Sequence, residues 1–108
     1  MADKTNEELS PFAAPALTVM ASLADGPKHG YAIMQEAERL TGQRMGPGTL
    51  YAALSRLERR GLIEALPADD RRRPYRLTGL GATALQAHLD QLQSFAAKAL
   101  QRLEGGAA

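Results

Sequence analysis

Residues 48–63 carry an apolar stripe together with polar and cationic side chains at the spacing of one helix. Four apolar side chains recur at i, i+3, i+4 and i+7: Leu50, Ala53, Leu54 and Leu57. The other faces offer short polar groups, one aromatic ring and arginines, with few acids: Thr49, Tyr51, Ala52, Ser55, Arg56 and Arg59. Such groups can donate to phosphates and read base edges, so this pattern predicts a helix suited to a DNA major groove.

Each position on this helix suggests a different contact. Free backbone N–H groups around Gly48 and Thr49, at the expected start of the helix, can hold a phosphate. The side chains of Tyr51, Ser55 and Arg56 could reach base edges or phosphates, and an arginine fork matches guanine O6 and N7. Ala52 could touch a thymine methyl group, while Arg59 lies further along and is expected at the DNA backbone. For Tyr51 the alternative is that its ring packs against the core.

A basic hairpin is expected directly after this helix. Gly61 ends the helix, residues 62–66 form a strand candidate, and residues 75–77 read as the returning strand. The tip contains Arg71, Arg72 and Arg73, which would lie along or in the minor groove. The net charge is only +1, but residues 55–76 hold seven arginines against four acids. Positive charge is therefore concentrated here, although any one arginine could be ordinary solvated surface.

Two helices are expected before the helix that carries Leu50 to Leu57. The first begins near Ser10–Pro11, a cap followed by a proline, and ends at residues 25–27. The second runs from about His29 to Leu40. Residues 43–45 then form a short connection or a brief strand. In a helix-turn-helix the second of these helices crosses the DNA backbone, so Tyr31, Lys28 and His29 are candidate phosphate ligands. For His29 the alternative is a helix cap, and for Tyr75, in the returning strand, a place in the core.

A long final helix, expected over residues 80–102, has an apolar seam of its own. Six side chains follow 4-3-4-3 spacing, as in a coiled coil: Leu85, Leu89, Leu92, Ala96, Ala99 and Leu103. Phe95 widens the stripe. The seam favours packing against a second copy in a homodimer, and the alternative is that the helix folds back on its own domain. A small apolar or aromatic effector could bind between this helix and the first two, around Phe12, Met20, Leu92, Phe95 and Ala96. The alternative is that these residues fill the dimer core.

Composition excludes several classes of protein. The absence of cysteine removes disulfides and thiolate metal sites, and His29 and His88 have no partner at metal-ligand spacing, so no metal or cofactor is expected. Scattered acids and the lack of a nucleophile motif exclude an enzyme. The sequence contains no run of ~18 apolar residues, so no membrane-spanning helix is expected. The first ten residues are polar and lack the apolar core of a signal peptide. A cytoplasmic location is therefore expected.

Several segments in this order resemble the PadR family of bacterial transcriptional regulators. They are residues 26–33 (GPKHGYAI), 48–58 (GTLYAALSRLE), 61–63 (GLI) and 73–78 (RPYRLT), together with Gly81. The resemblance implies a winged helix-turn-helix plus a C-terminal dimerisation region, usually in a repressor, here in the short form with one C-terminal helix. The family often has proline where Ala52 stands. Some short members also use a tryptophan of the last helix to sandwich flat drugs, and this chain has none.

These observations predict a mainly α fold with a small β hairpin. Residues 10–78 are expected to form the winged-helix DNA-binding domain and residues 79–104 the dimerisation helix, with flexible tails at 1–9 and 105–108. The predicted function is a homodimeric, sequence-specific regulator that binds a pseudo-palindromic double-stranded operator, represses transcription and is released by a signal. The alternative is a winged-helix protein-interaction module without specific DNA binding, which would not need the arginines at the wing.

Overall fold

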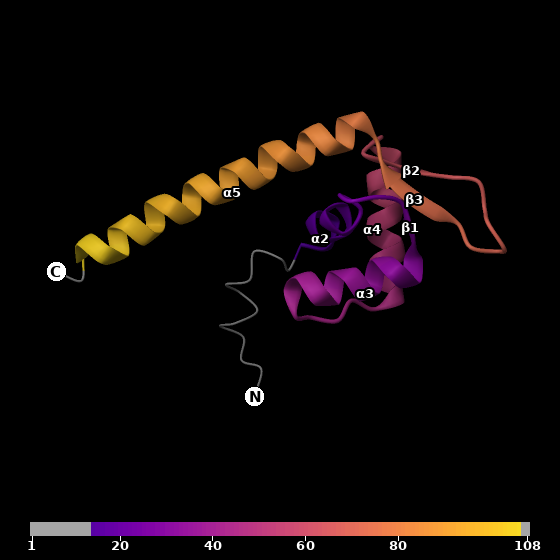
Figure 1. The fold of residues 1–108 in the computed structure, drawn as a ribbon, viewed down its shortest axis with the longest axis horizontal. Coiled ribbons are helices and arrows are strands. Elements are labelled where there is room, and N and C mark those ends of the chain that lie inside the picture. The colour runs from indigo at the N-terminus through magenta and orange to yellow at the C-terminus, as the bar shows by residue number, and fades with distance from the viewer. Residues whose placement is uncertain (1–13, 107–108) are drawn as a thin grey trace.

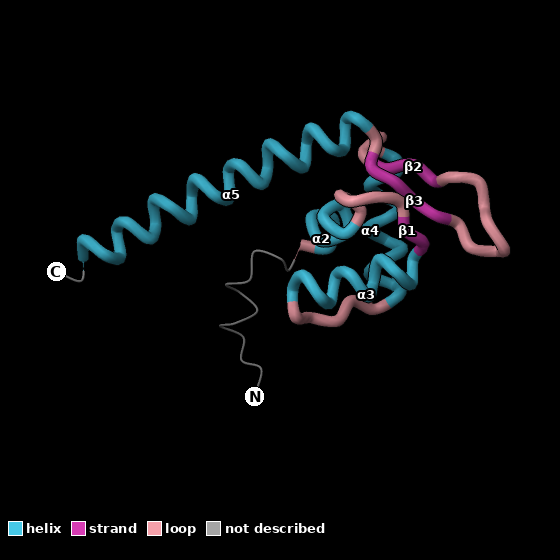
Figure 2. Tube along the Cα trace, in the orientation of Figure 1, coloured by secondary structure: helices cyan, strands magenta, loops and turns pink. Residues whose placement is uncertain are grey.

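The computed structural model describes residues 14–106 of the 108-residue chain. The helices are α2 (Pro15–Ser22), α3 (Gly30–Thr41), α4 (Pro47–Arg59) and α5 (Gly79–Gly106), and the strands are β1 (Lys28–His29), β2 (Ile63–Ala65) and β3 (Pro74–Leu77). Helices α2, α3 and α4 gather into one unit with the sheet at its edge, and α5 runs away from that unit as a long arm (Figure 1). Figure 2 shows the loop that projects beyond β2 and β3 at the opposite end.

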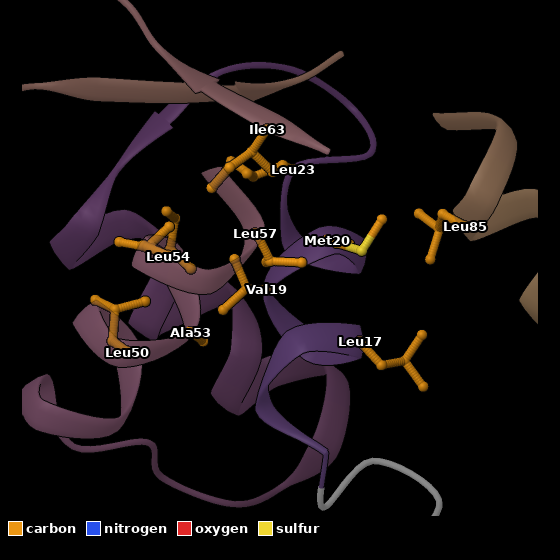
Figure 3. Packing of buried hydrophobic residues seen from close by; sticks show 11 residues of the cluster. Leu17, Val19, Met20, Leu23, Leu50, Ala53, Leu54, Leu57, Ile63 and Leu85 are labelled. Atoms are coloured by element: carbon orange, nitrogen blue, oxygen red, sulfur yellow. The ribbon is translucent and has the colours of Figure 1, made fainter. Parts of the chain in front are cut away.

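The core lies where α2, α3 and α4 meet. The predicted stripe of α4 is buried in it, and α2 contributes Leu17, Val19 and Met20. Figure 3 shows Val19 among the apolar side chains of α4, with Leu23 and Ile63 of β2 close by. Each fully buried Leu or Ile contributes about 1.5–3 kcal/mol, so this cluster is what holds the exposed face of α4 in place.

The sheet has one strand more than the sequence predicts. Its order is β1-β3-β2 and both pairs are antiparallel. The expected β2–β3 hairpin is present, with Ile63 opposite Leu77. Residues 43–45 form no strand, and β1 is instead made by Lys28 and His29, which pair with Tyr75 and Pro74. Two residues are too few to show a period of two, so only the pairing with β3 makes them a strand.

Helix ends differ from expectation by a few residues. Helix α4 begins at Pro47 with Gly46 at the cap, two residues before the expected start, because proline suits the first helical position. Helix α3 ends at Thr41, followed by Gly42 in the left-handed conformation with φ 74°. The expected helix start at Ser10 and Pro11 lies outside the described residues.

Helix α5 is bound tightly to the sheet at its beginning. The Thr78 hydroxyl donates to the Gly61 carbonyl at 2.6 Å and accepts from the Gly81 N–H at 3.0 Å. The Thr78 N–H also bonds the Leu62 carbonyl at 3.1 Å. The helix then continues to Gly106, so residues 105 and 106 belong to it and not to a tail as expected.

The seam of α5 is divided between two roles. Leu85, predicted to lie in the dimer seam, is only 6% exposed and packs in the core of its own domain. Figure 3 shows it facing Met20 and Leu17 of α2. Leu89 and Leu92 are half-buried against the same cluster, whereas Phe95 and Leu103 are each 71% exposed. Across residues 14–106, no helix has both the length and the apolar character needed to cross a membrane.

Candidate nucleic-acid interface

Helix α4 presents its polar face to solvent. Burial of the leucine stripe leaves the predicted contact residues exposed: Gly48, Thr49, Tyr51, Ala52, Ser55, Arg56 and Arg59. The Arg59 guanidinium donates to the Ser55 hydroxyl at 3.2 Å, so these two side chains lie together one turn apart. The face therefore carries small donors near its start and guanidinium groups toward its end.

Arginines of α4 and of the loop between β2 and β3, called the wing from here on, keep their charge unpaired. Among residues 14–106 the ion pairs engage Lys28, Arg39, Arg44 and Arg76. None of these pairs involves Arg56, Arg59 or the wing residues 71–73, and all five of those side chains are exposed. Unpaired guanidinium groups on a solvent-facing surface are suited to binding phosphates bidentately.

Lys28 differs from the wing arginines. Its side chain is 18% exposed, and its ammonium forms a hydrogen-bonded ion pair with Asp25. That hydrogen bond, with the charge of the ammonium, lowers the pKa of the Asp25 carboxyl below its usual value. The lysine proposed from the sequence as a phosphate ligand therefore already has an anionic partner.

The wing tip is a tight turn with an unusual backbone. Asp69 and Arg72 exchange backbone hydrogen bonds of 2.7 and 2.9 Å. Between them Asp70 and Arg71 have φ values of 51° and 70°, the left-handed pair found in type I′ hairpin turns. Aspartate tolerates this conformation, but an arginine there is strained by about 1 kcal/mol.

Replacing Arg71 by Asn should separate stability from DNA binding. Asparagine adopts positive φ readily, so we expect Arg71→Asn to raise the free energy of unfolding by about 0.5–1 kcal/mol while weakening DNA binding through the lost charge. Arg73→Asn removes the same charge at a residue without positive φ and should weaken binding with no gain in stability. Thermal unfolding and DNA titration of both variants test this, and equal stabilities would contradict the turn strain.

A side-chain contact ties the wing to the beginning of α3. The Arg72 Nη1 lies 3.3 Å from the His29 Nε2, a distance at which the guanidinium donates to the ring. His29 occupies the N-cap position of α3, but its side chain makes no capping hydrogen bond. His29 therefore occupies the cap position, as the alternative interpretation expects, but its side chain does not cap the helix and contacts Arg72 of the wing.

A cavity of about 350 Å³ lies where α3, α4 and the wing meet. It is lined by aromatic and basic residues: His29, Gly30, Tyr31, Tyr51, Arg71, Arg72, Arg73 and Tyr75. Burial raises the pKa of the Tyr75 hydroxyl, and the nearby Glu58 carboxylate raises it further. Tyr75 packs partly against the core, as its alternation with Arg76 predicts, and also reaches this cavity. A lining of guanidinium and phenol donors attracts an anionic group.

Sequence reasoning found most members of this surface but not all. It named His29, Tyr31, Tyr51 and the wing arginines, which the fold brings to one cavity. It did not identify Gly30, which lines the cavity opposite the Tyr51 side chain and has no functional group of its own. Within the described part of the chain no three His, Cys, Asp or Glu residues cluster as metal ligands would.

Residues of the expected effector site are not enclosed by one chain. Met20 is buried in the core, Leu92 is half-buried, and Phe95 and Ala96 face outward from α5. Phe12 lies outside the described residues. A pocket made from this set would therefore need a second chain to cover α5.

A family model matches more than half of the chain. Residues 19–87 match the model of the transcriptional regulator PadR-like family. The chain is 41% identical over 91 residues to the transcriptional regulator Rv3488 of Mycobacterium tuberculosis, covering 82% of this chain and 84% of that protein. It is 47% identical over 70 residues to an uncharacterised 37.1 kDa protein in transposon TN4556 of Streptomyces fradiae, covering 65% of this chain but only 20% of that relative.

A solved structure has a similar fold. RosR of H. salinarum is 31% identical, with a TM-score of 0.68, over 75% of this chain and 74% of that one. The fold, a three-stranded antiparallel sheet beside α2, α3 and α4, is the winged helix that the sequence predicts. The chain belongs to the transcriptional regulator PadR-like family.

Proposed function

We propose that this protein is a homodimeric regulator that binds a specific double-stranded DNA operator and represses transcription until a signal releases it. Its family consists of transcriptional regulators, which bind DNA and are not enzymes. The observation that carries the proposal is the unpaired cationic surface shared by α4 and the wing. The leucine stripe buries one face of α4, and that burial leaves Thr49, Ser55 and Arg56 free to enter a major groove.

The exposed end of α5 supports the dimer. Apolar side chains that the winged domain does not cover lie along it: Phe95, Leu100 and Leu103. A helix of 28 residues is about 42 Å long, so two copies have room for a coiled-coil contact beyond Leu92. A two-fold dimer would present two α4 helices to successive major grooves, about 34–36 Å apart, and requires a pseudo-palindromic operator.

The proposal is tested by an unbiased selection of DNA. Duplexes recovered from fragmented host DNA by the purified protein at about 150 mM salt are sequenced, and the selection is repeated at higher salt. A recovered pseudo-palindrome that persists at higher salt supports specific binding. Weak recovery without a common sequence that disappears with salt would contradict it and favour the protein-interaction module.

Arg56 is expected to read a base within each half-site. Arg56→Ala should weaken operator binding by about 1–3 kcal/mol and relax selectivity at one base pair per half-site, because the arginine fork pairs with guanine O6 and N7. Titration against the operator and its single-base variants measures both effects. Arg60→Ala, which removes an exposed arginine beyond the end of α4, is the control. An equal loss on every sequence would make Arg56 a phosphate contact instead.

A small apolar or aromatic effector is proposed to act at the dimer contact. Phe95 and Ala96 of two chains, together with Leu92 and Met20, could enclose such a molecule. A panel of aromatic acids and cationic drugs that leaves both the melting temperature and operator affinity unchanged would remove the support for this site.

A further inference from the structure

Gly30 faces the end of the Tyr51 side chain across the α3–α4 contact. A β-carbon on residue 30 would lie 2.5 Å from the Tyr51 hydroxyl oxygen, 3.2 Å from its Cζ and 3.4 Å from Leu50 Cδ2. The first of these distances is well inside van der Waals contact, so any side chain at residue 30 would need the space that the hydroxyl occupies. Gly30 belongs to α3 and lacks a positive φ, so space and not backbone conformation calls for glycine here.

The same packing places Tyr51 in the wall of the cavity. Its ring extends from α4 to the first turn of α3, and it remains 53% exposed although its hydroxyl lies against Gly30. The same cavity is also lined by Arg71, Arg72 and Arg73 of the wing. Tyr51 is therefore the residue of α4 that shares a cavity with the wing, and Gly30 determines where its hydroxyl lies.

We propose that Gly30 is a positioning residue for DNA recognition, because its missing side chain seats the Tyr51 hydroxyl where it and the wing arginines can bind one backbone phosphate. This inference rests on the proposed function and adds to it a residue that positions a DNA-binding side chain. One phosphate held from both α4 and the wing would set the position of the recognition helix in its groove. Backbone contacts of this kind determine register without reading sequence.

The contacts of the wing fit this role. Arg72 is held beside the cavity by its contact with His29, which neighbours Gly30 in the chain. Residues 71–73 have no acidic partner among the ion pairs of residues 14–106, so a phosphate would not have to displace a carboxylate. A phenol held in place before binding loses little freedom when the phosphate arrives.

A double-mutant cycle on the full chain tests the inference. Operator affinity and its salt dependence are measured for wild type, Gly30→Ala, Tyr51→Phe and the double variant. Gly30→Ala should weaken binding about 5- to 10-fold and reduce the salt slope by about one, as the loss of a phosphate contact does. The displaced atom is the free end of an exposed side chain, so the melting temperature should stay near that of wild type.

The result in the Tyr51→Phe background is decisive. Phenylalanine lacks the oxygen that collides with residue 30, and the next atom, Cζ, is 3.2 Å away. Tyr51→Phe should weaken binding as Gly30→Ala does, and adding Gly30→Ala should then cost nothing more. Gly79→Ala is the matched control, because Gly79 is also the first residue of its helix and an added β-carbon there meets nothing within 4 Å.

Two results would overturn the inference. One is unchanged affinity in Gly30→Ala, and the other is an equal loss from Gly30→Ala with either residue at position 51. If wild type selects no operator, the proposed function fails separately. The same cycle on an arbitrary duplex at low salt then still reports whether residue 30 acts through the tyrosine hydroxyl, since phosphate contacts do not depend on sequence.

Discussion

The double variant Phe95→Arg/Leu103→Arg is expected to be a folded monomer that binds its operator at least about 100-fold more weakly than wild type. Both side chains are 71% exposed in one chain, so they contribute little to the stability of the winged domain. In a dimer they would be covered, and two buried guanidinium groups per chain without partners would separate the copies. A monomer contacts only one half-site. It therefore loses the increase in affinity, typically 10²–10⁴-fold, that linking two DNA-binding domains provides.

A charge-matched variant isolates the effect of the seam. Ser94 and Gln101 are exposed on the same helix. Ser94 lies nine residues from Leu85, half a turn away from the seam. Ser94→Arg/Gln101→Arg adds the same charge and should remain dimeric with unimpaired affinity. Sedimentation and operator titration of both variants give the answer, and a Phe95→Arg/Leu103→Arg protein that still sediments as a dimer would place the contact elsewhere.

Gly81→Ala should destabilise the protein by about 3 kcal/mol, the largest stability effect expected of any single methyl group here. A β-carbon on Gly81 would lie 1.9 Å from the Leu62 carbonyl oxygen and 2.9 Å from its carbon. These are backbone atoms of the β2 end of the sheet, and they cannot swing away as a side chain can. Relief requires α5 to move, which breaks the Thr78 cap and withdraws Leu85 from the core.

Thermal and denaturant unfolding of Gly81→Ala against Gly79→Ala measures this effect. Gly79 lies two residues earlier in the same helix with open space around it, so Gly79→Ala should leave stability within about 0.5 kcal/mol of wild type. Similar stabilities for the two variants would mean that α5 is not held against Leu62. Gly30→Ala provides a further contrast, because there the obstacle is a movable side chain and the expected loss is in binding.

Elements with a long, regular pattern could be predicted from the sequence. The stripe of Leu50, Ala53, Leu54 and Leu57 repeats over two turns of helix, and burial of every member follows because only one face can meet the core. The basic tip between two strands is equally local, since turn residues and flanking apolar positions lie within a few residues of one another. The face that α4 leaves exposed to solvent follows directly from the face that it buries.

Patterns that depend on a distant partner could not be assigned. Strand β1 exists because Lys28 and His29 meet β3 more than forty residues away, and two residues alone have no strand signature. The seam of α5 is a second case, because its 4-3-4-3 spacing is the same whether a leucine packs on its own domain or on another chain. Only the fold shows that Leu85 belongs to the first group, while Leu103 stays exposed.

The sequence by itself therefore determined the winged-helix class, the amphipathic helix α4, the basic wing and the chemistry of the exposed donors. Each of these is encoded by residue types at short, regular spacing. The tertiary structure alone decided that Lys28 is paired with Asp25 and that Arg72 contacts His29. It also decided that Gly30 faces the movable side chain of Tyr51, whereas Gly81 faces the backbone of Leu62. A glycine has no side chain from which a role could be predicted. The close approach of another chain segment that it permits is known only from the tertiary structure.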